Sequence, residues 1–149
     1  DFAPSDPHFE RRVRDSFARQ GIMSHIGATM AGVAAGECEI RLPYGDHVSQ
    51  QHGFFHGGIV ATVADSAAGY AGFSLMPADA GVLTVEFKIN LVTPAHGDLL
   101  IARGSVVRPG RTLTVSRAEV AVSKGGREHV CAVLQQTLMT VIGRRDVMG

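Results

Sequence analysis

The chain has 149 residues, a length that suits one domain with its own hydrophobic core. Its 14 Lys and Arg residues balance its 14 Asp and Glu residues, and a net charge of zero argues against a nucleic-acid-binding protein. Hydrophobic residues make up 45%, which excludes a wholly disordered chain, while the charged fraction of 19% indicates surface hidden in an oligomer. No segment is apolar enough for a membrane span, and we expect a cytoplasmic protein.

The first predicted element is a helix over about residues 7–20. Asp6 can cap it, Pro7 suits the first helical position, and Gly21 can end it. Its apolar side chains recur every four residues and predict one docking face, formed by Phe9, Val13 and Phe17. We expect this helix to be a packing element without a catalytic role.

The middle of the chain predicts a strand followed by one long apolar helix. Residues 37–42 alternate between charged and apolar side chains, a pattern typical of a half-buried strand. After a polar loop over residues 43–53, the run from His56 to Met76 is strongly apolar, and Pro77 follows it. This run is expected to form the central helix.

The remaining sequence predicts four consecutive strands joined by short turns. They are expected over residues 82–91, 99–107, 113–123 and 129–141. Short turns between consecutive strands indicate an antiparallel sheet. The whole order therefore predicts one α+β domain over residues 1–149.

Asp65 is the only charged residue between His56 and Ala78. On a helical wheel it lies on the side of the small residues Ala61, Ala68 and Gly72, opposite the large ones, and we expect the large side to pack on the sheet. A carboxylate in such a place is costly to bury unless it is paired or used. Two interpretations follow: a functional acid, or a surface Asp bonded to a neighbouring loop.

The sequence His56-Gly57-Gly58 stands just before this helix. The first amides of a helix have no internal partner, so they can bind an anion or an oxygen on which negative charge develops. His52 and His56 have the four-residue spacing of a metal pair, but the glycines oppose a continuous helix there and no third ligand is near. We expect no metal site.

These motifs resemble those of a known family. The run HGGIVATVADSAAGYA, with Gln50 upstream, is similar to the signature of hotdog-fold acyl-CoA thioesterases of the phenylacetate-degradation type. The turn that contains Pro94, Ala95, Gly97 and Asp98 and the later turn Gly110-Arg111-Thr112 recur in that family in the same order. The resemblance covers about residues 38–141.

The resemblance implies a hotdog fold, in which an antiparallel sheet wraps a long central helix, and a homodimer or a dimer of dimers with active sites between subunits. It implies Asp65 as the general base or nucleophile and the Gly58 amide as the oxyanion donor. His56 would support the turn, Gln50 would position water or the carboxylate, and Thr84 would help to hold the attacking water from the partner subunit.

The resemblance also implies a substrate. Coenzyme A would enter as part of an acyl-CoA, with its phosphates near Gly110, Arg111 and Thr112, and no separate cofactor is expected. Two other functions stay open: a hotdog hydratase or dehydratase acting on an acyl thioester, and a non-catalytic protein that binds or senses acyl-CoA. The chain has no GxSxG elbow and no GxGxxG or GxxxxGK[ST] motif, so it shows no sign of a serine α/β-hydrolase or of the common nucleotide sites.

Overall fold

The computed structural model describes residues 1–149 and consists of one six-stranded antiparallel sheet and a 17-residue helix that packs on it. The helices, in chain order, are α1 (Phe9–Ala18), α2 (Gly21–Ile26), a 3-10 turn (Asp46–Val48) and α3 (Gly57–Phe73). The strands are β1 (Thr29–Ala34), β2 (Glu37–Pro43), β3 (Ala80–Leu91), β4 (Leu99–Arg108), β5 (Leu113–Lys124) and β6 (Arg127–Ile142).

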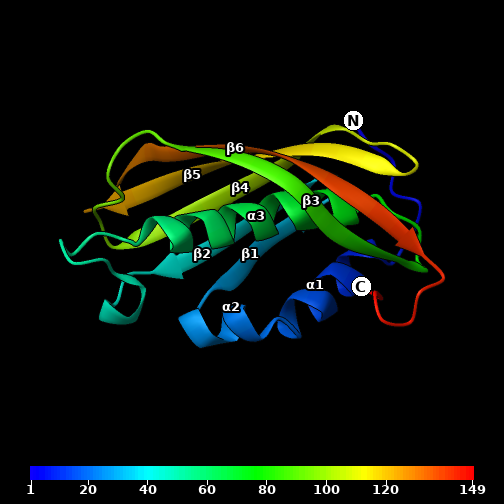
Figure 1. Cartoon of the computed structure of the whole chain (residues 1–149), viewed down its shortest axis with the longest axis horizontal. Coiled ribbons are helices and arrows are strands. Elements are labelled where there is room, and N and C mark those ends of the chain that lie inside the picture. Colours follow the sequence, from blue (N-terminus) through cyan, green and yellow to red (C-terminus); the bar gives the residue numbers. More distant parts are fainter.

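The strands lie in the order β1-β2-β4-β5-β6-β3, and every neighbouring pair is antiparallel. Figure 1 shows the sheet curving around α3, with α1 and α2 next to β1 at one edge of the sheet. The core lies between α3 and the concave face of the sheet. The predicted α+β layout and the hotdog architecture are thus confirmed.

The small residues of α3 are the ones that face the sheet. Gly104 of β4 comes so close to α3 that a Cβ atom there would lie 2.2 Å from the carbonyl oxygen of Ala67, and Leu138 of β6 fills the space over Gly72. The expectation that the large side packs on the sheet holds only in part, since Val63 and Phe73 of that side are buried in the core and Tyr70 points elsewhere. Tyr70 of that side packs instead against Phe17 of α1, with 6.1 Å between the ring centroids.

The first helix is shorter than predicted. It begins at Phe9 and ends at Ala18, because Asp6 accepts a hydrogen bond from the His8 amide outside the helix and Pro7 stays in the preceding turn. Gly21 begins the second short helix, α2. Neither α2 nor β1 was predicted, since each has only six residues of small or mixed composition, too few to show a periodicity.

Strand β3 lies at one edge of the sheet and pairs only with β6. Most of its residues are exposed, including the apolar side chains of Leu83, Val85, Phe87 and Leu91, which are 45 to 54% exposed. A long apolar edge strand left open is prone to pair with another chain. This edge is the surface of the fold that most needs a partner.

Candidate active site

Asp65 lies in the middle of α3 and is held by two hydrogen bonds. The Thr84 hydroxyl of β3 and the Gln136 side-chain amide of β6 both donate to Asp65 Oδ1, each at 2.8 Å. The carboxylate is half-buried, and Oδ2 takes part in neither bond. An acid oriented in this way keeps one oxygen free to accept a proton from water or to attack an electrophile.

Thr84 comes from the same chain as Asp65. Strand β3 reaches the helix here because a bulge after Thr84 shifts the register of its pairing with β6, and the Thr84 side chain faces α3. The resemblance had implied a contribution from the partner subunit.

Gln136 is a site residue that the sequence analysis missed. It is 1% exposed, and its Oε1 accepts a hydrogen bond from the Ser116 hydroxyl at 3.2 Å. The signal for it is a lone polar side chain between Leu134 and Leu138 on the inward face of β6. A buried amide is satisfied only if both its ends find partners, so the Ser116–Gln136–Asp65 chain fixes the carboxylate in one orientation.

The start of α3 is capped by its own histidine. His56 Nδ1 accepts a hydrogen bond of 2.9 Å from the Gly58 amide, so the predicted oxyanion donor is engaged inside the chain. The Gly57 amide, by contrast, has no hydrogen-bond partner in the chain. The free donor at the positive end of α3 is therefore Gly57.

Gln50 organises the loop before α3. Its Oε1 accepts from the amides of His52, at 2.6 Å, and Phe54, at 3.2 Å. Gln50 and Gly57 line one cavity of about 430 Å³, together with Leu91 of β3. A different cavity, of about 330 Å³, contains Asp65.

Within one chain the predicted site residues thus form two groups. Thr84 lies with Asp65, whereas Gln50 and His56 lie with Gly57 at the start of α3. Eight residues of helix separate Gly57 from Asp65, roughly 12 Å along the axis. The two groups of one chain cannot contact a single carbonyl together.

The remaining predicted residues form the turn between β4 and β5. The Gly110 amide donates to Thr114 Oγ1 at 3.3 Å, and the Thr112 carbonyl accepts from the Thr140 amide at 2.8 Å. The Arg111 side chain is exposed and makes no ion pair within the chain. Arg111 is therefore available to a ligand, although the turn itself is fixed.

A larger cavity, of about 630 Å³, lies on the outer face of the sheet, and the acids that line it are Glu37, Glu39 and Glu119. Arg103, which also lines it, contacts both Glu39 and Glu128, and its hydrogen bond to Glu128 raises the pKa of Arg103. None of these acids accepts hydrogen bonds from neutral side chains as Asp65 does, so Asp65 is the candidate acid. No three His, Cys, Asp or Glu side chains are gathered as a metal site, and none of the helices combines the length and apolarity of a membrane span.

Comparison with known proteins identifies the family. A model of the thioesterase superfamily matches residues 52–129. A crystal structure of a thioesterase family protein from Silicibacter pomeroyi is 50% identical, with a TM-score of 0.89 over 91% of this chain and 99% of that chain. A Halobacterium salinarum protein named as an esterase is 38% identical over 68% of this chain and 69% of its own length.

A third relative carries a named reaction. The 1,4-dihydroxy-2-naphthoyl-CoA hydrolase of Listeria monocytogenes is 24% identical over 70% of this chain and 97% of its own length. The chain belongs to the thioesterase superfamily, and it is a thioester hydrolase. The narrower resemblance to the phenylacetate-degradation type stays a prediction.

Proposed function

We propose that the protein hydrolyses an acyl-CoA to the free acid and coenzyme A, with Asp65 as the general base or nucleophile. The observation that carries this proposal is the single oriented carboxylate on α3, which has one oxygen free and opens into a cavity. When water attacks, Asp65 accepts its proton, the water oxygen bonds to the carbonyl carbon, and the carbon–sulfur bond breaks. The coenzyme A thiolate then takes up a proton.

The amides at the start of α3 supply the second requirement of the reaction. Negative charge develops on the carbonyl oxygen in the transition state, and a free amide at a helix N-terminus stabilises it. Gly57 is the free donor, and the Gly58 amide joins it if the His56 ring turns away. Gln50, in the same cavity, would orient the thioester or a water molecule there.

A second copy of the chain completes the site in this proposal. One chain holds Asp65 and Gly57 roughly 12 Å apart, so the amide that faces a given Asp65 must come from another α3. The apolar edge of β3, which carries both Thr84 and the exposed Phe87, supports pairing of two copies along this strand. The active assembly is then a homodimer, or a dimer of dimers.

Coenzyme A would lie along the surface with its phosphates at the β4–β5 turn. Arg111, free of ion pairs, can bind phosphate there, beside Gly110 and Thr112. The reaction named for the Listeria relative supports a coenzyme A thioester as substrate. A cytoplasmic location belongs to the same proposal, since coenzyme A thioesters are formed and consumed there.

A thiol-release assay tests this function. We expect the wild-type protein to release coenzyme A from at least one acyl-CoA in a panel from acetyl to palmitoyl that includes phenylacetyl and hydroxybenzoyl. The protein's own cysteines should not react with the thiol reagent, because burial raises the pKa of Cys38 to about 12 and that of Cys131 to about 11. Binding of acyl-CoA without turnover would contradict hydrolysis and favour a sensor. Addition of water to the carbon–carbon double bond of an unsaturated acyl-CoA, without release of coenzyme A, would favour a hydratase.

A further inference from the structure

The cavity that contains Asp65 has a second polar wall, formed by the N-terminal helices. Ser16 of α1 and Gln20, at the junction between α1 and α2, line this cavity opposite the Asp65 turn of α3. They contact the Tyr70 hydroxyl, Ser16 at 3.1 Å and the Gln20 amide at 2.8 Å. The Ser66 hydroxyl donates to Gln20 Oε1 at 3.5 Å. Nothing in the proposed hydrolysis uses this wall.

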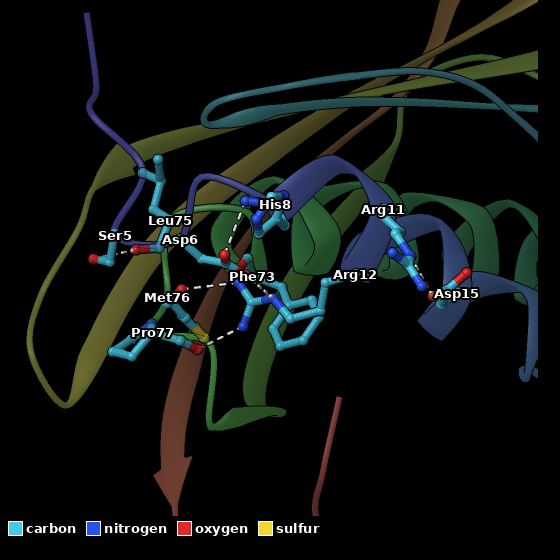
Figure 2. Close-up of polar contacts among 10 residues, drawn as sticks. All are labelled: Ser5, Asp6, His8, Arg11, Arg12, Asp15, Phe73, Leu75, Met76 and Pro77. Atoms are coloured by element: carbon cyan, nitrogen blue, oxygen red, sulfur yellow. Dashed lines mark hydrogen bonds and ion pairs between the residues drawn. The ribbon is translucent and has the colours of Figure 1, made fainter.

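The wall is held in place by a half-buried arginine. Figure 2 shows the Arg12 side chain lying over Phe73 and pointing at the last turn of α3 and the residues after it. Its guanidinium donates to the Met76 carbonyl at 2.8 Å, lies 3.2 Å from Asp6 Oδ2 and stacks 4.4 Å from the Phe73 ring centre. Carbonyls at a helix C-terminus lack internal partners, so this cation fixes α1 against α3.

The four-residue spacing of Arg12, Ser16 and Gln20 places the cavity wall on the same side of α1 as the anchored arginine. Arg12, Ser16 and Gln20 recur every four residues and therefore follow one side of α1 and its junction. Arg12 meets the end of α3, while Ser16 and Gln20 meet Tyr70 one turn earlier. The wall is thus positioned by tertiary contacts rather than left mobile.

The wall has hydrogen-bonding capacity that the chain does not use. The Gln20 amide donates one N–H to Tyr70, and its Oε1 accepts only the long hydrogen bond from Ser66. One N–H and one oxygen lone pair of Gln20 therefore remain without a partner. If the Gln20 side-chain amide is turned by 180°, so that its oxygen and nitrogen change places, one donor and one acceptor still remain free. Tyr70 is 4% exposed and supports Gln20 from behind, whereas Gln20 and Ser66 are half-buried at the cavity surface.

Charge and size restrict the group that fits. A carboxylate would lie near Asp65, and an ammonium group would lie near Arg19, which also lines the cavity. A hydroxyl is both donor and acceptor, so it matches what Gln20 leaves free. The volume of about 330 Å³ holds on the order of ten non-hydrogen atoms, if each takes the ~30 Å³ share of a water molecule in the liquid.

We propose that Gln20 and Ser66, supported by Tyr70 and Ser16, are specificity-determining residues that bind a hydroxyl at the far end of a short acyl group. The inference rests on the proposed function, because it places the thioester carbon of that group at Asp65. The acyl group runs from Asp65 along Ser66 and Gly69 to Gln20, all of which line one cavity. Short hydroxyacyl-CoA thioesters are then the preferred substrates, and long unsubstituted chains are excluded.

Paired substrates that differ by one hydroxyl test the proposal. We expect the wild-type kcat/KM to be about 10-fold or more higher for the ω-hydroxy form of a four- to six-carbon acyl-CoA than for the unsubstituted form. Gln20→Leu should bring the ratio to about one, because the apolar side chain removes the donor and the acceptor together. Ser66→Ala should lower the ratio less. Arg11→Ala, on the exposed side of α1, is the matched control and should keep it.

A binding measurement separates this proposal from the hydrolysis itself. Thioether analogues of the same pairs, which lack the carbonyl group, should bind the wild type with the same preference for the hydroxyl, and Gln20→Leu should remove it. Equal affinity for both analogues, or a preference unchanged in Gln20→Leu and Ser66→Ala, would overturn the subsite. Hydroxyl-dependent binding without any release of coenzyme A would instead overturn hydrolysis and leave the subsite standing. Circular dichroism of each variant verifies that it is folded.

Discussion

Replacement of Asp65 by Asn is expected to lower kcat/KM for coenzyme A release by about 10²–10⁴-fold, the range of a positioned general base. The amide cannot accept a proton from water and cannot attack a carbonyl group. Its oxygen can still accept the hydrogen bonds of Thr84 and Gln136, so the site should keep its shape. Affinity for a thioether analogue of the substrate should therefore stay within about threefold of the wild type, since binding and chemistry are separable.

Asp15→Asn is the matched control for this variant. Asp15 carries the same side chain on an exposed turn of α1, and its change should leave the rate unaltered. If Asp65→Asn kept more than a tenth of the wild-type rate, the acid would not be the reacting group, and its hydrogen bonds would have only a structural role.

Gly57→Pro is expected to produce the second large effect, a loss of about 10²–10³-fold in kcat, as for removal of one oxyanion donor. Proline suits the first position of a helix and deletes only the amide N–H, which has no partner in the chain. His56, the preceding residue, already has the extended backbone that precedes proline, with ψ at 137°. The first turn of α3 should therefore keep its structure in this variant.

Gly57→Ala separates the amide from the added side chain. It keeps the N–H and introduces the same Cβ atom, which meets only the flexible end of Leu91, at 2.9 Å. The alanine variant should retain at least about a third of the wild-type kcat, because Leu91 is exposed and can move. A loss in Gly57→Ala as large as in Gly57→Pro would assign the effect to crowding and contradict the role of the amide.

The sequence predicts the larger elements of this fold well. Alternation along β2 and β6 and the long apolar run of α3 are strong signals, and each of these elements lies within a few residues of its expected place. The orientation of α3 was not predictable, because it depends on a close approach between Gly104 and Ala67, residues 37 positions apart. Periodicity identifies the two faces of a helix but not which one the sheet takes.

The site was predictable in part for a related reason. Asp65 stood out as a lone acid in an apolar helix, and the structure brings Thr84 to it. Gln136 escaped notice because its importance comes only from its hydrogen bond to Asp65 of α3, 71 positions away in the sequence. The distinction between Gly57 and Gly58 depends on the rotamer of His56, and no sequence pattern specifies that rotamer.

Mixing two inactive variants tests the central claim most directly. The claim is that each active site takes Asp65 from one chain and the start of α3 from another. Dimers of Asp65→Asn and dimers of Gly57→Pro should each be nearly inactive. A mixed dimer contains one site with both changes and one site with neither.

After equal amounts are unfolded together and refolded, about half of the dimers should be mixed, so we expect roughly a quarter of the wild-type rate. Refolded wild type sets the reference, and each variant refolded alone gives the background. A rate no higher than the mean of the two parents would mean that a single chain forms the whole site, and the account would be contradicted.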